Sequence, residues 1–439
     1  MHPNQILKKI KEDKVKFISL QFSDLLGAIK EVIIQAKEIE DAIENGIWFD
    51  GSSIEGFARI EESDLFLKPD LDTYSLVPWS MENGKTARII CDIFRPDGKP
   101  FEGDPRFILK ETLKEAEKMG FEYNVGPEPE FYLFKNTEDG KKPMDGGGYF
   151  DLSSHDGYNL IKEIIEALKY FGINVETSHH EVGKGQYEID FNYGQALNIA
   201  DKLITLKYTV KKLAQMRNMK ATFMPKPLKD FPGSGMHVHQ SLFKNGKNIF
   251  FDEKDKYNLS ETAYSFIAGQ MKSVKSMCAI LCPTINSYKR LVSGFEAPVY
   301  ITWARMNRSA LIRVPKWFGK KPNSARMEIR CPDPICNPYL AFSVMLKAGL
   351  EGVKRELKPP EPVEDNAYGF DFETLKNKKI ELLPNSLGEA LFEMERADYI
   401  KEVFGEHLFN KYIEIKKKEL EEFRLQVTDW ETKKYLDTY

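Results

Sequence analysis

Four segments of the chain carry charged or hydrogen-bonding side chains at alternate positions. Their residues are Glu128 and Glu130, Glu188 and Asp190, His237, His239 and Ser241, and Arg326, Glu328 and Arg330. Alternate residues of a β-strand point to the same face of a sheet, so each segment alone is consistent with an ordinary strand that has one solvated face. Glutamate and aspartate are poor strand formers, however. Their recurrence in several segments favours a sheet that carries a charged site on one face.

If these strands are neighbours, their carboxylates predict a binding site for divalent cations. Like charges held close together repel each other unless cations lie between them. A set of carboxylate oxygens with an occasional imidazole suits magnesium or manganese. Zinc is the weaker alternative, because His179, His180, His237 and His239 occur without an H-E-x-x-H motif or a set of cysteines.

The length and the distribution of turn residues predict two domains. A chain of 439 residues exceeds the roughly 250–300 residues at which one core stops growing. Short β-branched or aromatic runs around one helical stretch predict a small α+β unit first. The runs are 15–22, 29–34 and 87–94, and the helical stretch is near 37–44. Turn formers between Arg95 and Pro105 mark its end, so we expect domains at 1–103 and 104–439.

The larger domain is expected to begin and end with helices. Pro105–Met119 has helical periodicity, with Asp104 as a candidate N-cap and Pro105 at the first helical position. Beyond the proline-rich connector 358–362, the chain is predicted to be largely helical. Its Lys/Glu-rich stretch 411–424 is expected to be a solvated helix face.

Composition argues against several classes of partner. The 63 Lys and Arg residues against 67 Asp and Glu residues give a net charge of −4, so no field of one sign points to nucleic acid or to an anionic membrane. No stretch approaches the roughly 18 apolar residues of a membrane span. Five cysteines without a C-x-x-C pair indicate reduced thiols, and we expect a cytoplasmic location.

The nucleotide motifs exclude a P-loop and a dinucleotide fold. The Gly-Lys-Thr run 84–86 lacks the earlier glycine of a P-loop, where Trp79 stands, and the glycines 146–148 lack the G-x-G-x-x-G spacing. Six arginines instead fall within 41 residues, and guanidinium groups bind phosphates and carboxylates through paired hydrogen bonds. They are Arg290, Arg305, Arg308, Arg313, Arg326 and Arg330. Scattered surface charges are the alternative interpretation.

Eight short motifs occur in order along the chain. They are Phe49–Ser53, Gly126–Phe131, His179–Glu181, Gly233–His237, Asn286–Leu291, Phe295–Pro298, Asn307–Ala310 and Pro332–Pro334. With these motifs the sequence resembles type I glutamine synthetase along essentially its whole length. The resemblance implies an α+β fold, with an N-terminal β-grasp-like domain and a large catalytic α/β domain on a curved antiparallel sheet. It also implies a homo-dodecamer of two stacked hexameric rings that ligates ammonia to L-glutamate with ATP, through γ-glutamyl phosphate.

The resemblance assigns the metal ligands in two sets of three. One set is Glu130, Glu181 and Glu188, and the other is Glu128, His237 and Glu328. Asp190 lies outside both sets, although strand alternation groups it with Glu188. The implied cofactor is Mg²⁺ or Mn²⁺, with two or more ions in each active site.

The resemblance also assigns the substrate contacts. The nucleotide contacts are Glu176, His239, Ser241, Arg313 and Arg326. The glutamate contacts are Gly233, Arg290 and Arg330, and Arg308 faces the transferred phosphate. The ammonium group is bound by Asp50 with Ser53 nearby, donated across a subunit boundary, with Tyr149 beside the pocket and Glu296 on a flap that closes it.

Some positions depart from the family pattern or bear on regulation. Pro232 stands where the family usually has an asparagine that contacts substrate glutamate. The segment 316–325 is a few residues longer than in the family, so the lysine that contacts the nucleotide stays open. Tyr368 lacks the Asn-Leu-Tyr-Asp-Leu-Pro context of the adenylylated subtype, and Arg59 matches an arginine of glutamine feedback inhibition. We therefore expect the shorter, feedback-inhibited alpha-type subclass, and leave a regulatory protein partner open.

Two other functions are weighed against this interpretation. A ligase of the same fold that joins glutamate to a polyamine would share the metal and ATP residues but alter the ammonium pocket. The pocket residues Asp50, Ser53 and Glu296 are all present. A catalytically inactive member with a structural or regulatory role would lose metal ligands, and all six are present.

Overall fold

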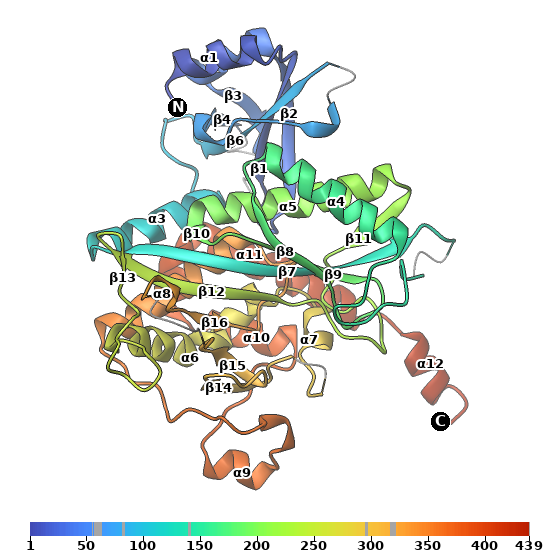
Figure 1. Cartoon of the computed structure of the whole chain (residues 1–439), viewed down its shortest axis with the longest axis vertical. Coiled ribbons are helices and arrows are strands. Elements are labelled where there is room, and N and C mark those ends of the chain that lie inside the picture. The colour runs from blue at the N-terminus through green and yellow to red at the C-terminus, as the bar shows by residue number, and fades with distance from the viewer. Residues whose placement is uncertain are drawn as a thin grey trace.

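The computed structural model describes residues 1–54, 56, 64–80, 84–138, 142–294, 297–316 and 322–438. Within them, buried side chains form a small cluster in the N-terminal part and a large cluster that covers most of the remaining chain. Figure 1 shows the smaller unit, in blue, above the larger one. No helix in these ranges is long and apolar enough to cross a membrane.

The N-terminal domain is a mixed sheet packed against two helices. Its strands are β1 (Phe17–Ser23), β2 (Ile29–Gln35), β3 (Ile47–Asp50), β4 (Asp64–Pro69), β5 (Ser75–Leu76) and β6 (Thr86–Phe94), and its helices are α1 (Pro3–Glu12) and α2 (Ile39–Asn45). The strand order is β2-β1-β6-β4-β3, with β1 parallel to β6. Ile6 and Ile10 of α1 and Ile39 of α2 pack onto the apolar face of these strands. The predicted runs at 15–22, 29–34 and 87–94 are confirmed as β1, β2 and β6, whereas α1 was not predicted.

The larger domain is built on a sheet of ten strands among the described residues. Its strands are β7 (Glu122–Lys135), β8 (Val175–His180), β9 (Gln186–Phe191), β10 (Gly194–Gln195), β11 (Met219–Thr222), β12 (Met236–Lys244), β13 (Lys247–Asn248), β14 (Tyr300–Ala304), β15 (Ala310–Arg313) and β16 (Met327–Ile329). The main order is β14-β15-β16-β12-β7-β9-β8, antiparallel throughout except for β14 with β15. The predicted α+β class with a large antiparallel sheet is confirmed.

Helices surround this sheet and form the C-terminal part of the chain. They are α3 (Pro105–Lys118), α4 (His155–Tyr170), α5 (Ala196–Met216), α6 (Glu261–Leu281), α7 (Ser287–Arg290), α8 (Pro338–Lys354), α9 (Phe372–Asn377), α10 (Leu387–Glu395), α11 (Asp398–Arg424) and α12 (Asp429–Tyr435). The predicted helix at 105–119 is α3, and Asp104 caps it by accepting from Arg106 N. Lys416 is buried, an exception to the solvated face expected for 411–424. The domain boundary after residue 103 stays a prediction.

Strand β7 carries Pro127 and Pro129 in the stretch where its neighbour on one side changes from β10 to β9. One side of β7 pairs with β12, while the other side pairs with β10 up to Val125 and with β9 from Glu130 onward. The N–H of Glu130 donates toward β12, so the alternation of strand hydrogen bonds turns both proline nitrogens toward the gap. A proline costs no ladder hydrogen bond there. The gap leaves room beside Glu128.

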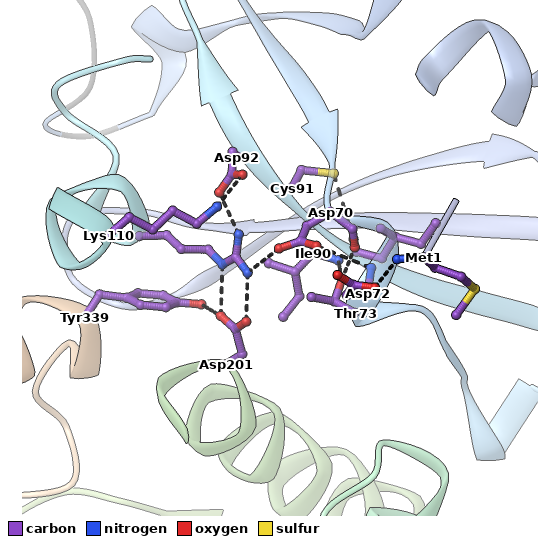
Figure 2. A network of polar contacts seen from close by, with 12 residues as sticks. Met1, Asp70, Asp72, Thr73, Ile90, Cys91, Asp92, Lys110, Asp201 and Tyr339 are labelled. Carbon is purple, nitrogen blue, oxygen red and sulfur yellow. Dashed lines mark hydrogen bonds and ion pairs between the residues drawn. The ribbon is translucent and has the colours of Figure 1, made fainter. Parts of the chain in front are cut away.

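A buried arginine, Arg106, joins the two domains, and its partners Asp70, Asp92 and Asp201 are labelled in Figure 2. Arg106, in the first turn of α3, donates from Nε and Nη2 to the carboxylate of Asp201 in α5 at 3.0 and 2.9 Å. It also donates to Asp92 in β6 at 2.6 Å and to Asp70, which follows β4, at 2.7 Å. Tyr339 of α8 donates to Asp201 at 2.6 Å. One cation thus connects carboxylates of both domains.

The five cysteines are buried free thiols, as the sequence predicted. Cys278 and Cys282 lie at the C-terminal end of α6, and Cys282 Sγ donates to the carbonyl of Cys331 at 3.1 Å. Among the residues that the structure describes, neither group of potential metal ligands includes a cysteine.

Candidate active site

The cross-strand register brings the predicted polar residues into rows on the large sheet. Glu130 of β7 lies opposite Glu188 of β9, which in turn lies opposite His179 of β8. In the next row, Glu128 of β7 lies opposite His237 of β12. Directly opposed residues on one face have Cβ atoms about 4.5–5.5 Å apart. Four strands thereby place three carboxylates and two imidazoles next to one another.

A further row crosses β12, β16 and β15. His239 lies opposite Glu328, and Glu328 lies opposite Arg313. The side chain of Glu328 is fully buried, and its carboxylate accepts from Arg313 Nε and, at 3.2 Å, from Arg330. His237 Nδ1 lies 3.5 Å from Glu328 Oε1. The charge of this glutamate is therefore balanced by two arginines before any ligand binds.

Hydrogen bonds determine which nitrogen of His239 carries the proton. Arg326 Nε donates to His239 Nδ1 at 3.2 Å, so the proton is on Nε2, which donates to Glu128 Oε1 at 2.7 Å. Glu128, His239 and Glu328 each offer a ligand atom, and these atoms lie within 4.8 Å of one another. This cluster shares two residues with the second predicted ligand set and has His239 in place of His237.

A second cluster lies across β8 and β9. His179, Glu188 and Asp190 bring ligand atoms within 4.8 Å of one another. His179 Nε2 lies 3.3 Å from Glu188 Oε1, and His179 Nδ1 lies 3.5 Å from Glu181 Oε1. Asp190, which strand alternation groups with Glu188, therefore lies beside the site. Glu181 and Glu188 are predicted ligands, whereas His179 has no predicted role.

The carboxylates of Glu130 and Glu188 oppose each other's ionisation. Burial, with the nearby Glu181, raises the pKa of Glu130 to about 8, although Glu130 accepts from Gln186 Nε2 at 2.8 Å. Burial, with Glu130 and other carboxylates, raises the pKa of Glu188 to about 11. Burial also lowers the pKa of His237 to about 4, which keeps its imidazole neutral. Crowded carboxylates with a neutral imidazole are a donor set that a cation would stabilise.

Unsatisfied polar atoms point to the same conclusion. His179 Nδ1, Asp190 Oδ1 and Arg330 Nε are buried without a hydrogen bond to any described residue. Buried polar atoms are nearly always bonded, so such atoms commonly mark a bound ion, water or ligand. Carboxylate oxygens with one or two imidazoles suit hard divalent cations. The residues present fit such ions.

A cavity of about 310 Å³ lies beside the carboxylates. Its lining includes Glu176, His239, Ser241 and Arg326, which are four of the five predicted nucleotide contacts. Glu128 also borders the cavity, so the cavity reaches the candidate metal site. This neighbourhood can hold a phosphorylated ligand with its charged end toward the candidate metal ligands.

Two family descriptions match nearly the whole chain. "Glutamine synthetase, beta-Grasp domain" matches residues 14–96, and "Glutamine synthetase, catalytic domain" matches residues 102–435. The chain belongs to the glutamine synthetase family. It is a glutamate–ammonia ligase that uses ATP, and binding of ATP and divalent metals is a trait of the family.

Relatives of similar length support this membership. A glutamine synthetase of Clostridium saccharobutylicum is 49% identical over 438 residues, which cover 99% of this chain and 98% of that protein. A glutamine synthetase of Methanococcus maripaludis is 50% identical over 442 residues, which cover 98% of each. The solved structure of Plasmodium falciparum glutamine synthetase has a TM-score of 0.90 at 29% identity and 99% coverage of both chains. An ADP complex of GmaS has a TM-score of 0.89 at 29% identity, covering 98% of this chain and 99% of that one.

In this glutamine synthetase chain, the predicted glutamate contacts are tightly packed. Arg290 is buried and donates to the carbonyls of Cys331 at 2.7 Å and Arg330 at 3.0 Å. A Cβ at Gly233 would clash with the carbonyl oxygen of Pro225 and lie 2.7 Å from Arg290 Cγ, so a larger residue at this position would force both the backbone and the arginine to move. Arg308, by contrast, is exposed in the loop between β14 and β15.

Asp50 and Ser53, which are predicted to bind ammonium, lie away from the other predicted site residues of the same chain. Asp50 ends β3 and is exposed, and Figure 1 shows β3 in the N-terminal domain, apart from β7, β8 and β9. Its carboxylate accepts from the side chain of Ser52 at 2.6 Å and of Ser53 at 3.5 Å, and the hydrogen bonds from Ser52 hold the pKa of Asp50 below its usual value. Tyr149 lies at the site, with its ring centroid 5.6 Å from that of His179.

Some predicted residues lie outside the described part of the chain. They are Glu296 on the expected flap, Arg59, and the lysines at 320 and 321. Lys316, the remaining candidate for the nucleotide-contacting lysine, is exposed. Their roles stay predictions.

The sequence patterns did not identify Gln186 and Asp145, which hydrogen-bond to a predicted ligand or to the strands that carry the ligands. Gln186 donates to Glu130 at 2.8 Å and to the carbonyl of Gly233 at 3.1 Å. Its alternation with Glu188 and Asp190 on β9 was a signal that could have found it. Asp145 has no such signal, because it lies in a loop and meets its partners only in the folded chain.

Proposed function

We propose that the glutamine synthetase reaction uses two divalent cations, Mg²⁺ or Mn²⁺, held by the two sets that the family resemblance assigns. The sets are Glu130, Glu181 and Glu188, and Glu128, His237 and Glu328. His239 lies close to the second set, but it also lines the cavity next to Arg326. We therefore assign it to the nucleotide, with Glu176, Ser241, Arg313 and Arg326.

Cations held by these two sets would supply positive charge to balance the γ-phosphate of ATP and the side-chain carboxylate of glutamate. Arg290 and Arg330 are proposed to hold the glutamate, and Arg308 to stabilise the charge of the transferred phosphate. The carboxylate oxygen displaces ADP and forms γ-glutamyl phosphate. Because water would hydrolyse this anhydride, the flap that carries Glu296 is proposed to close the site.

Asp50 is proposed to accept a proton from ammonium. A carboxylate is ionised at neutral pH and can accept a proton, although the hydrogen bonds from Ser52, which lower the pKa of Asp50, weaken it as a base. The ammonia that results attacks the γ-carbonyl carbon, phosphate leaves, and glutamine forms. Since β3 lies apart from the site within one chain, a neighbouring subunit is proposed to supply Asp50 and Ser53, with Tyr149 beside the ammonium.

The opposition of Glu130 and Glu188 across β7 and β9 carries this proposal. Its test is a coupled assay of phosphate release with glutamate, ATP and ammonium. We expect Glu188→Ala to lower the rate by about 100-fold or more, since it removes a metal ligand. Glu166→Ala, on the exposed side of α4, is the control and should keep the wild-type rate. Equal rates for wild type and Glu188→Ala would refute the metal assignment.

The nitrogen donor of this glutamate–ammonia ligase is ammonia, and its preference over larger amines can be measured. The ammonium residues of the family are present at Asp50, Ser53 and Glu296. Turnover with ammonium should therefore exceed turnover with putrescine at equal concentrations of the reactive free base. A preference for putrescine would assign the chain to amine ligation instead.

The sequence context of Tyr368 favours feedback control over adenylylation. Tyr368 is half-buried, and its hydroxyl donates to the carbonyl of Ala297 at 2.9 Å. We propose membership of the alpha-type subclass, with glutamine inhibition acting through Arg59. Arg59→Ala should retain activity and lose sensitivity to glutamine. Modification of Tyr368 by an adenylyltransferase in a reconstituted assay would contradict the proposal.

The C-terminal end supports the proposed dodecamer. Helix α12 projects from the body of the chain (Figure 1), and Trp430 and Leu436 are exposed on it and just after it. We propose that this tail docks on the opposite hexameric ring. Truncation after Thr428 should yield hexamers in analytical ultracentrifugation, and a stable dodecamer would refute the docking.

A further inference from the structure

Asp145 is a loop carboxylate that accepts hydrogen bonds from several directions. Tyr187 of β9 donates its hydroxyl at 2.6 Å, and His180 of β8 approaches through Nε2 at 2.7 Å. The backbone N–H groups of Gly185 and Ser154 donate at 3.2 and 3.3 Å. One side chain thus connects two strands, the turn between them and the start of α4.

The imidazole of His180 is held between two acceptors. Its Nδ1 lies 2.7 Å from the backbone carbonyl of Glu181, on the opposite side of the ring from Asp145. The ring is fully buried, and a Cβ at Gly147 would lie 3.0 Å from its Nε2. The ring therefore has one orientation, and it fixes the backbone that presents the Glu181 carboxylate.

His180 and Tyr187 lie on the face of the strand pair opposite to the candidate metal site. They pair directly across β8 and β9, and the neighbouring pair is His179 with Glu188. Because successive strand residues face opposite sides, the metal residues point to one face and His180 and Tyr187 to the other. Asp145 binds the two strands together from this second face.

Through His180, the same carboxylate also holds the loop that carries Tyr149. Gly147 packs against the His180 ring, and the N–H of Phe150 donates to the carbonyl of His180 at 3.0 Å. The Tyr149 ring then packs edge-on against the His179 ring, with centroids 5.6 Å apart. Movement of Asp145 would therefore shift the metal-bearing strands and the proposed ammonium pocket together.

We propose that Asp145 is a positioning residue that sets Glu181 and Glu188 for metal binding and Tyr149 for ammonium. This inference rests on the roles proposed for those three residues. Partners that orient metal ligands commonly change metal affinity by about 10–100-fold when they are replaced. Asp145→Asn keeps the shape of the side chain but cannot accept from both His180 and Tyr187 through two carboxylate oxygens.

The test measures Mn²⁺ binding to the purified full-length enzyme by electron paramagnetic resonance, alongside steady-state kinetics. Asp145→Asn should weaken Mn²⁺ binding at one site by about 10-fold or more and raise the KM for ammonium, with the KM for ATP within about 2-fold of wild type. Asp151→Asn is the matched control. Asp151 is exposed in the same loop and accepts from Gly148 N at 2.8 Å, and its replacement should change neither quantity.

Tyr187→Phe keeps the inference testable if Asp145→Asn does not fold. It removes one donor to Asp145 and should shift Mn²⁺ affinity and the KM for ammonium in the same direction by a smaller factor. Unchanged values in Tyr187→Phe and in any folded Asp145→Asn would overturn the inference. Glu188→Ala separates this failure from that of the proposed function: if it loses Mn²⁺ while Asp145→Asn does not, the ligand assignment stands and the positioning role falls.

Discussion

At the scale of single residues, the candidate site has one half whose charge is balanced by protein groups and one half in which buried carboxylates crowd one another. Glu328 is fully buried but bonded to Arg313 and Arg330. Glu130 and Glu188 face each other instead, and burial raises the pKa of both. A buried charge is tolerated when it is paired. The set around Glu188 therefore has the greater need of a cation.

A substitution at Pro232 should strengthen the binding of substrate glutamate. The Pro232 carbonyl accepts from the Tyr132 hydroxyl at 2.6 Å, and any residue at position 232 can keep this bond. Pro232→Asn would add the amide that the family usually has. A hydrogen bond to a charged group contributes about 1.5 kcal/mol, so we expect the KM for glutamate to fall about tenfold. Pro232→Ala is the control, and a fall of the same size there would attribute the effect to loss of the ring.

Asp333 should make stability depend on pH. It is fully buried, Oδ1 accepts from Ile335 N at 3.2 Å, and Oδ2 has no hydrogen bond to a described residue. Burial raises its pKa to about 8, so the folded protein keeps a proton that the unfolded chain releases near pH 4. The stability that protonated Asp333 contributes is therefore fully present below about pH 4 and is lost as the pH rises toward 8. Asp333→Asn should raise the melting temperature relative to wild type more at pH 8.5 than at pH 5, and a difference independent of pH would contradict this.

At the scale of elements, hydrogen bonds with the segment 360–368 hold the loop that carries Arg308. Trp303 Nε1 donates to the carbonyl of Pro360 at 2.6 Å, and Val363 N donates to the carbonyl of Trp303 at 2.9 Å. Asn307 donates to the carbonyls of Val363 and Asp365 at 3.0 and 2.6 Å. The segment that continues from the proline-rich connector thus also holds the loop that carries Arg308.

Asn307→Asp should release this loop. The new carboxylate oxygen would face two carbonyl oxygens in place of an amide donor, and unpaired or repelling polar groups cost about 1–3 kcal/mol. Because Arg308 is the next residue, we expect kcat to fall about 10-fold or more with a smaller change in the KM for ATP. Steady-state kinetics at saturating substrates measure this.

Asn366→Asp, in the segment 360–368, is the matched control for Asn307→Asp. Its side chain accepts from Tyr368 N at 3.1 Å, and a carboxylate accepts equally well in such a cap. Its kcat should equal that of wild type. If both variants lose kcat alike, the effect is one of added charge rather than of the Asn307 hydrogen bonds.

At the scale of the whole molecule, the two domains share a buried network of charges. Arg106 connects Asp70 and Asp92 of the N-terminal domain with Asp201 of the catalytic domain. A buried ion pair adds little net stability by itself, but removing one partner leaves the other charge unpaired. The orientation of the domains should thus depend on this side chain.

Arg106→Met should destabilise the protein by about 3–5 kcal/mol, because it leaves buried carboxylates without their cationic partner. A lower midpoint in thermal or urea unfolding measures the loss. Arg95→Met removes an exposed pair with Glu102 at 3.0 Å and should change stability by less than about 1 kcal/mol. Similar losses in both variants would argue against a special role for the network.

The amino-acid sequence alone determined the composition of each strand face, the helix that Asp104 caps, and, through its motifs, the family. Alternation depends on neighbouring residues, so it placed Glu128 with Glu130 and Glu188 with Asp190 before any fold was known. The tertiary structure decided which faces meet, because register is set by packing between strands that are far apart in the chain. It placed Glu130 opposite Glu188, and it brought Asp145 to His180 across 35 residues. No local pattern encodes such contacts, and the separation of Asp50 from the site within one chain likewise follows from the arrangement of domains.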